Sequence, residues 1–352
     1  MTMHYAPKII KLAEREPFDV TWSNGLLLRS TNWLGDALMT LPAAYQMSRL
    51  LPRACGFFVL CPKFLVPLWE ACPWVSCAIG MEGKRIAQEE IRDVHSLCVG
   101  TAVVFPNSFG SAMDVYRCHI RNRVGRTGRF RSLLLTHRLP EWPRSKGSAE
   151  FHQLSYYLDL AASLGKIDYT TDYPSLKTDR ELAQRLGMEG DNWLAVAPGA
   201  AFGPAKQWPA EHYLAVAKWH SANGGRVVFV GTKSEMAVTQ ELSAQLPGSL
   251  DLAGRTNLTE LMAVLAKARF AVANDSGAMH LAAAVGTRGV AVFGSTDPTA
   301  TGPIGAPWRL IVSPAECRPC FQRTCPRSEK PYFCLREILP EQVIEELKAL
   351  EV

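Results

Sequence analysis

Short apolar runs alternate with longer amphipathic stretches along much of the chain. In the first half, three apolar runs predict buried strands, at 26–28, 57–60 and 103–105. The stretch 36–51 carries apolar residues at roughly helical spacing and predicts a helix directly after the first strand. The first half therefore begins as a strand followed by a helix.

The second half repeats this rhythm more regularly. Four apolar runs predict strands, and the amphipathic stretches after them predict helices; the strands are 194–197, 227–230, 270–273 and 290–293, and the helices are 210–221, 234–245, 258–267 and 277–285. Strands that alternate with helices of about 10–15 residues indicate βαβ units and a parallel sheet.

A polar stretch at 165–192 is typical of a linker and separates the two halves. At roughly 150 residues per domain, the 352 residues suggest about two domains. We therefore expect an α/β protein with two Rossmann-like domains whose parallel sheets face a cleft. The expected bounds are 1–170 for the first domain, 190–335 for the second domain with a cysteine-rich segment at 315–334, and 336–352 for a C-terminal helix.

Composition and charge exclude several classes of protein. The 38 basic and 33 acidic side chains leave a net charge of +5, which is mild for a general nucleic-acid binder. The N-terminal stretch lacks the apolar core of a secretory signal, and the longest uncharged run, 96–113, is interrupted by Gly and Pro. We therefore expect a cytoplasmic protein with no transmembrane segment, whose ten cysteines are thiols or metal ligands.

Several common motifs are absent from the sequence. It has no G-x-G-x-x-G, no Walker A motif, no H-E-x-x-H and no G-x-S-x-G. It also has no D-x-D, the carboxylate pair that commonly holds a metal-bound nucleotide sugar. Ligands of parallel sheets bind at the carboxyl ends of the strands, so the corners where strand meets helix are the places to look for chemistry.

At the first such corner, Asp36 follows the strand 26–28 and precedes the predicted helix. An aspartate in this place can cap the helix. It can also take a proton from an acceptor hydroxyl, because it stands at the carboxyl end of a strand. The two roles are compatible with one another.

Two corners of the second half predict anion binding. After 194–197, Gly199 and its small neighbours let backbone N–H groups approach a ligand, and Lys206 adds a charge; the alternative is a surface loop with a solvated lysine. After 270–273, Asp275 or Ser276 can cap the next helix.

The backbone N–H groups of Ser276 and Gly277 favour a phosphate at that helix N-terminus. His280 lies one turn into the same helix, either near the ligand or packed in the core. After 227–230, Glu235 either meets a ribose diol, as a carboxylate past such a strand commonly does, or serves the first turn of its own helix.

Three strings of residues, in this order along the chain, resemble glycosyltransferase family 9: Asn32–Asp36, Gly203–Pro209, and Asn274–His280 with Phe293–Thr296. Within that family the sequence is most similar to the ADP-heptose:lipopolysaccharide heptosyltransferases, the heptosyltransferase II branch in particular. The resemblance runs from about residue 25 to residue 345. It implies a GT-B fold and an inverting transfer of heptose from ADP-L-glycero-D-manno-heptose to a heptose of the lipopolysaccharide inner core, with no metal on the diphosphate.

The resemblance also implies roles for individual residues. The matching positions are Asp36 as general base, Lys206 on the donor diphosphate, Glu235 on the ribose, Asp275 on the heptose, Ser276 and Gly277 as phosphate-binding amides, and Thr256 beside the adenine. Some relatives carry hydroxyl residues where this chain has Ala201 and Phe202, so backbone amides must do more here. A protein heptosyltransferase of the autotransporter type, or a non-catalytic protein that binds nucleotide sugars, are the alternative functions.

Six arginines and no acid lie between Arg117 and Arg131. Four of them, Arg117, Arg121, Arg123 and Arg126, are candidates for binding the carboxylates and phosphates of a lipopolysaccharide core acceptor at the inner membrane surface. A nucleic-acid patch is disfavoured by the scarcity of aromatic residues in the run. A solvated loop is the remaining alternative.

Four cysteines, Cys317, Cys320, Cys325 and Cys334, follow the pattern C-x₂-C-x₄-C-x₈-C. They predict a structural zinc or iron site, or else free or reversibly oxidised thiols. Such a site precedes the last helix, 340–350, and is expected to position that helix rather than to contact the donor. No cofactor is expected for the chemistry itself.

Overall fold

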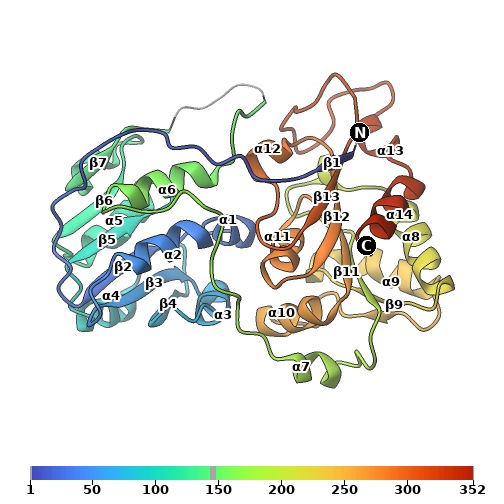
Figure 1. Cartoon of the computed structure of the whole chain (residues 1–352), viewed down its shortest axis with the longest axis horizontal. Helices are drawn as coiled ribbons and strands as arrows, with labels where there is room; N and C mark the ends of the chain where they lie inside the picture. Colours follow the sequence, from blue (N-terminus) through green and yellow to red (C-terminus); the bar gives the residue numbers. More distant parts are fainter. Residues whose placement is uncertain (1, 143–147, 352) are drawn as a thin grey trace. The chain divides into compact units, whose positions relative to one another are not determined.

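The computed structural model describes residues 2–142 and 148–351 (Figure 1). The chain divides into two compact units. The N-terminal unit contains residues 9–142 and Phe151–Lys177. The C-terminal unit contains the chain from Thr178 onward, together with the first residues up to Lys8 and residues 148–150.

The N-terminal unit is built on a parallel sheet with the strand order β4-β3-β2-β5-β6-β7 over the described residues. The strands are β2 (Gly25–Arg29), β3 (Gly56–Pro62), β4 (Cys77–Met81), β5 (Thr101–Val104), β6 (Asn122–Arg126) and β7 (His137–Leu139). The helices are α1 (Leu34–Met39), α2 (Leu41–Arg49), α3 (Val66–Glu70), α4 (Gln88–Ser96), α5 (Phe109–Arg117) and α6 (Leu154–Ala162), with short 3₁₀ turns η1 (Lys63–Leu65) and η2 (Arg131–Leu134).

The C-terminal unit has the strand order β1-β13-β12-β11-β8-β9-β10, in which the N-terminal strand β1 (Thr2–His4) pairs antiparallel with β13 and the other strands are parallel. The other strands are β8 (Trp193–Ala197), β9 (Arg226–Phe229), β10 (Leu250–Asp251), β11 (Phe270–Asn274), β12 (Arg288–Phe293) and β13 (Trp308–Val312). The helices are α7 (Arg180–Arg185), α8 (Ala210–Ala222), α9 (Met236–Ala244), α10 (Leu258–Lys267), α11 (Gly277–Ala284), α12 (Pro298–Thr301), α13 (Phe333–Arg336) and α14 (Pro340–Ala349), with 3₁₀ turns η3 (Pro204–Lys206) and η4 (Lys233–Glu235).

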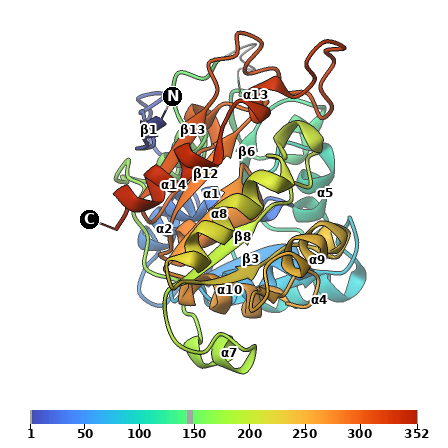
Figure 2. The ribbon, with the colours of Figure 1, turned by 90° about the vertical axis from the view of Figure 1, so that its right-hand side faces the viewer.

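The core of the C-terminal unit anchors its last helix. Figure 2 shows α8 and α14 together on one side of the sheet. Val343 and Leu347 of α14 are buried in the same apolar cluster as Val216 of α8 and Val290 of β12. Burying such side chains stabilises the unit by about 1.5–3 kcal/mol each. Helix α14 is therefore held by its packing against α8 and the sheet, in addition to any effect of the cysteine-rich segment.

Each sheet has one point where the chain reverses its direction of winding. In the N-terminal unit it lies between β2 and β5, and in the C-terminal unit between β8 and β11. Ligands of open α/β sheets bind outside the carboxyl ends of the strands at such a point. The loop that leads to Asp36 leaves β2, whereas Gly199 follows β8 and Asp275 follows β11.

The predicted strands and the helices of the second half are confirmed to within a few residues. The single helix predicted at 36–51 is wrong, because the structure has two helices, α1 and α2, that meet at Thr40. Pro42 lies in the first turn of α2, where its missing N–H costs nothing; inside one long helix it would have removed a hydrogen bond and met the carbonyl of Leu38.

The structure also contains strands that the apolar pattern did not indicate. β6 runs through the arginine-rich stretch, and β1, β4, β7, β10 and β13 were not predicted either. The pattern concealed β6 because its sequence, Asn-Arg-Val-Gly-Arg, is polar although Val124 and Gly125 are buried. The stretch from Arg117 to Arg131 is therefore not one continuous loop.

Candidate functional site

An ion pair joins two of the predicted donor residues at the switch point of the C-terminal sheet. The Lys206 Nζ lies 2.5 Å from the Asp275 Oδ2, and the side chains are 14% and 5% exposed. The Thr296 hydroxyl donates to the same Asp275 oxygen at 2.6 Å. The pair therefore brings together the loop after β8, the start of α11 and the loop after β12.

His280 is buried close to this ion pair. Burial lowers the pKa of His280 to about 4; the nearby Asp275 opposes this shift and Lys206 reinforces it. The ring is therefore neutral at pH 7. This matches the alternative of a packed histidine, although the ring remains within electrostatic reach of both partners.

Ser276 occupies the N-cap position of α11, and Gly277 is the first helical residue. The Ser276 side chain makes no capping hydrogen bond. Its Oγ is buried and, among the described residues, has no hydrogen-bond partner. Asp275 stands one residue before the N-cap position, and its Oδ2 accepts hydrogen bonds from Lys206 and Thr296. The N-terminus of α11 therefore carries no side-chain cap.

The two carboxylate oxygens of Glu235 have different surroundings. Its Oε2 accepts hydrogen bonds from the Thr232 N–H at 2.6 Å and from the Thr232 hydroxyl at 2.9 Å. Its Oε1 lies so close to Gly199 that a Cβ added there would be 1.8 Å away. Only glycine fits at position 199 while Glu235 keeps this orientation. The Oε2 of Glu235 thus binds the first turn of its own helix, which was one of the two roles considered from the sequence. The Oε1 faces Gly199.

Gly199 and Glu235 line a cavity of about 330 Å³ in the C-terminal unit. Its other walls come from the start of α8, from α9, from Tyr332 of the cysteine-rich segment and from Arg336 just after that segment. Thr256 is half-buried in the turn after β10, and that turn is tied to the carboxyl end of β9 by the Gly254 N–H, which donates to the Gly231 carbonyl at 2.8 Å. Gly199, Glu235 and Thr256 therefore lie along the carboxyl ends of β8, β9 and β10.

Two residues of the same corners were quoted in the family strings but given no role. The Asn274 side chain donates to the carbonyls of Pro198 at 2.7 Å and Gly199 at 3.1 Å, and it accepts from the Trp208 N–H at 2.9 Å. Thr296 positions Asp275. Asn274 ends β11 and Thr296 lies three residues after β12, and this position at the carboxyl ends of buried strands was the signal that could have identified them.

Asp36 is the third residue of α1 and belongs to the N-terminal unit. The N-cap position is occupied by Trp33, so Asp36 is not the helix cap. Burial raises the pKa of the buried Tyr157 phenol, and the negative charge of Asp36 raises it further. Asp36 is partly exposed, as a group that meets a substrate has to be.

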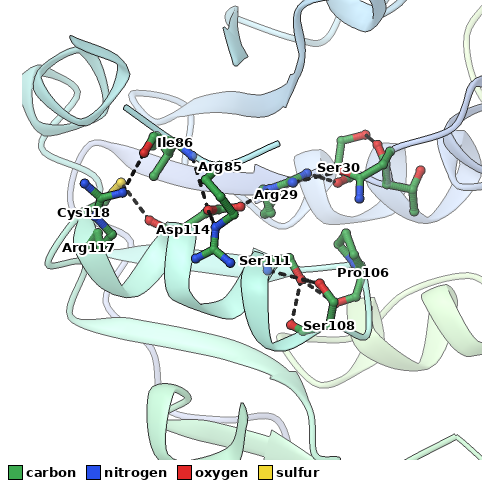
Figure 3. A network of polar contacts seen from close by, with 12 residues as sticks. Arg29, Ser30, Arg85, Ile86, Pro106, Ser108, Ser111, Asp114, Arg117 and Cys118 are labelled. Carbon is green, nitrogen blue, oxygen red and sulfur yellow. Dashed lines mark hydrogen bonds and ion pairs between the residues drawn. The ribbon is translucent and has the colours of Figure 1, made fainter. Parts of the chain in front are cut away.

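A buried ion pair between Arg29 and Asp114 fixes the loop between β2 and α1 (Figure 3). The Arg29 Nε lies 3.3 Å from the Asp114 Oδ2, and the side chains are 2% and 1% exposed. The Arg29 guanidinium also donates to the Ser30 carbonyl at 2.5 Å and to the Asn32 side chain at 2.9 Å. The Arg85 Nε lies 3.0 Å from the other carboxylate oxygen of Asp114, Oδ1. Arg29 thereby connects α5 to the loop between β2 and α1.

The four candidate acceptor arginines have different surroundings. Arg126 ends β6 and is buried, with its guanidinium 2.6 Å from Asp159. Burial lowers its pKa, and Asp159 opposes that effect. Arg117 donates to the Ile86 carbonyl at 2.7 Å, and Arg123 donates to the Leu134 carbonyl at 2.7 Å. Arg121, directly before β6, is exposed.

The four cysteines of the segment 315–334 are free thiols that are exposed or half-buried. Burial and the neighbouring Cys317, Cys320 and Cys325 together raise the pKa of Cys334 to about 11, while Arg318 opposes them. Within the described part of the chain, no group of three or more His, Cys, Asp or Glu side chains is arranged to hold a metal ion.

The cysteine-rich segment contacts the loop that carries Lys206. The Ala205 N–H donates to the Arg323 carbonyl at 3.1 Å, and the Phe321 N–H donates to the Ser295 carbonyl at 2.8 Å. The segment therefore lies against loops that carry candidate donor residues as well as preceding the last helix. The expectation that a metal there positions that helix rather than contacts the donor stays a prediction.

No helix in residues 2–142 and 148–351 is long and apolar enough to cross a membrane. Comparison with known proteins shows what the chain resembles. A family model described as "Glycosyltransferase family 9 (heptosyltransferase)" matches residues 94–331.

Two similar sequences are lipooligosaccharide heptosyltransferase 2 of Haemophilus influenzae, 29% identical over 92% of this chain and 99% of that protein, and lipopolysaccharide heptosyltransferase 2 of Escherichia coli, 30% identical over 92% and 98%. Among solved structures, E. coli ADP-heptose lipopolysaccharide heptosyltransferase II is similar with a TM-score of 0.77 and 27% identity, over 92% of this chain and 98% of that one. The expected GT-B architecture of two parallel-sheet units is confirmed.

Proposed function

Since the chain belongs to glycosyltransferase family 9, the heptosyltransferase family, we propose that it transfers heptose from ADP-L-glycero-D-manno-heptose to a heptose of the lipopolysaccharide inner core. The observation that carries this proposal is the Lys206–Asp275 pair at the switch point of a family 9 fold. The relatives named above act on lipopolysaccharide or lipooligosaccharide, which disfavours a protein acceptor. A purely binding role is disfavoured because Asp36 and Lys206 are both present.

In this proposal the chain's residues divide an inverting displacement between them. The Asp36 carboxylate takes the proton of the acceptor hydroxyl, the oxygen forms a bond to the anomeric carbon of the heptose, and the bond to ADP breaks. Lys206 and the backbone N–H groups of Ser276 and Gly277 stabilise the negative charge that grows on the leaving diphosphate. This electrostatic contribution is usually the largest one in such reactions.

Asp275 and Glu235 bind the neutral parts of the donor. Asp275 meets the heptose while Thr296 and Lys206 hold its carboxylate in place. Glu235 presents Oε1 to the ribose, because both hydrogen bonds from Thr232 end on Oε2. Gly199 and Thr256 border the same ligand, and His280 supports the pair as a neutral ring.

For the acceptor, the anionic groups of the core bind to the arginine-rich stretch. Arg121 has an exposed guanidinium for this purpose. The side chains of Arg117 and Arg123 donate to backbone carbonyls and so fix the conformation of the stretch. Arg126 does the same through its ion pair with Asp159. An acceptor that is anchored in lipid places the enzyme in the cytoplasm at the inner membrane surface.

The test is incubation of the purified protein with ADP-heptose and several truncated core acceptors, followed by mass spectrometry. The proposal expects one heptose to be added to a core that already ends in heptose. Addition to a protein acceptor instead, or no transfer to any core, would contradict it.

Lys206→Ala is expected to weaken ADP binding by about 1.5–3 kcal/mol, the range for hydrogen bonds to charged groups. The reason is that Lys206 is a cation held at the switch point, at the place assigned to the diphosphate. Isothermal calorimetry with ADP measures the effect. Lys218→Ala, on α8, is the control and should bind ADP like the wild type. Unchanged affinity in the Lys206 variant would remove Lys206 from the donor site.

We also propose that Cys317, Cys320, Cys325 and Cys334 bind a structural zinc or iron. Their spacing in the sequence supports this, since four thiolates within eighteen residues repel one another unless a cation neutralises them. Elemental analysis of protein prepared under reducing conditions is expected to find about one metal ion per chain.

Cys320→Ser should lose that ion, whereas Cys77→Ser, an exposed cysteine of the N-terminal unit, should keep it. Metal-free wild-type protein would leave the four cysteines as ordinary thiols. No step of the transfer depends on this metal.

A further inference from the structure

The cysteine-rich segment lies against two loops that supply donor residues. Figure 1 shows it as the orange-to-red loops between β13 and α13. Besides the hydrogen bonds from Ala205 and Phe321 described above, the Arg318 guanidinium donates to the carbonyls of Gly294 and, at 2.8 Å, of Thr296. The backbone of the segment is thus tied to the loop of Lys206 and to the loop of Thr296.

This contact places the Arg323 side chain against the same aromatic ring as Lys206. The Arg323 guanidinium carbon is 5.4 Å from the centre of the Phe202 ring, and the Lys206 Nζ is 4.9 Å from the centre of the same ring. The close approach needs a glycine at position 203, because a Cβ there would be 2.7 Å from the Arg323 carbonyl oxygen. Two cations from distant parts of the sequence therefore share one aromatic ring.

The two cations differ in how far their charge is compensated. Lys206 is paired with Asp275 at 2.5 Å. Arg323 is exposed, and across the described residues no ion pair joins it to a carboxylate. A diphosphate carries more than one negative charge, so Lys206 alone leaves an excess of negative charge on the ligand. Arginine suits the remaining task, because its planar fork can bind phosphate oxygens in pairs.

The aromatic ring of Phe202 explains why Lys206 and Arg323 both lie against it. A phenyl ring offers no hydrogen bond to a phosphate, but its face attracts cations by about 0.5–1 kcal/mol at exposed sites. The ring stabilises both cations, each within 5.4 Å of its centre, next to the Gly203–Lys206 loop. The Phe202 ring therefore makes no contact with the ligand itself, but it holds the two cations that bind the phosphate oxygens.

We propose that Arg323 is a second cation that binds the diphosphate of the donor, brought to the site by the cysteine-rich segment. This inference rests on the proposed function, since it assumes that Lys206 marks the position of the diphosphate. It gives the segment a role in substrate binding in addition to any structural role.

The test compares the binding of ADP and of adenosine to the full chain by calorimetry. Arg323→Ala is expected to weaken ADP binding roughly tenfold, which is the lower end for a hydrogen bond to a charged group. Adenosine, which lacks the phosphates, should bind to the variant as it does to the wild type. Arg323→Lys should recover part of the ADP affinity.

Arg327→Ala is the matched control, because Arg327 is an exposed arginine of the same segment. It should change ADP affinity less than twofold. Thermal melting of each variant checks that the segment remains folded. An equal loss of ADP and adenosine binding in Arg323→Ala would mean that the loop has moved, and it would overturn the proposal.

Normal ADP binding by Arg323→Ala also overturns the proposal. If Lys206→Ala is weakened in the same series, only the role of Arg323 is lost and the donor site stands. If both variants bind ADP like the wild type, the donor site assigned to Lys206 is wrong as well.

Discussion

Asp36→Asn is expected to lower kcat by roughly 100-fold or more while the affinity for ADP stays near that of the wild type. The amide keeps the shape of the side chain but cannot take a proton from the acceptor hydroxyl. Because Trp33 and not Asp36 occupies the N-cap of α1, the substitution removes no cap and should leave the fold intact. Steady-state kinetics with a truncated core acceptor, together with ADP calorimetry, measures both quantities.

Asp93→Asn provides the matched control, since Asp93 is an exposed aspartate on α4 of the same unit. Its kcat should equal that of the wild type. A normal kcat in Asp36→Asn would exclude Asp36 as the base. A large loss of ADP affinity in that variant would instead show that Asp36 acts on the donor.

Asp114→Ala is expected to destabilise the N-terminal unit by about 3–5 kcal/mol, the cost of leaving one member of a buried ion pair without its partner. The variant loses contacts to Arg29 and Arg85 and leaves the Arg29 guanidinium buried. Burial already lowers the pKa of Arg29, and Asp114 is the main group that opposes this. Urea denaturation followed by near-ultraviolet circular dichroism measures the change in the free energy of unfolding.

Asp168→Ala serves as the comparison, because the Arg49–Asp168 pair is exposed on both sides. Exposed pairs contribute only about 0–1 kcal/mol. Equal stability of the two variants would show that the Arg29–Asp114 pair does not hold the loop. If the pair does hold it, Asp114→Ala protein that remains folded should also have a reduced kcat, since Arg29 binds the loop leading to Asp36.

Local sequence was sufficient for most of the C-terminal unit. Its strands are continuous apolar runs and its helices begin at turn residues, so each element is encoded within about ten residues. The same locality explains why the candidate residues lie at strand ends: Gly199 follows β8, Glu235 follows β9, and Asp275 follows β11. The N-terminal unit was harder, because β6 carries arginines and Pro42 divides what the pattern indicates as one helix.

The sequence by itself determined the alternation of strands and helices, the family and the residue types at the strand ends. The tertiary structure alone decided which of those residues meet. Lys206 and Asp275 are 69 positions apart and pair because β8 and β11 are neighbours in the sheet. Arg126 pairs with Asp159 and is removed from the surface, and Arg323 reaches Phe202 because two loops share backbone hydrogen bonds. Local pattern encodes the period and the turn, whereas charge pairing depends on strand order and packing, which no short stretch of sequence contains.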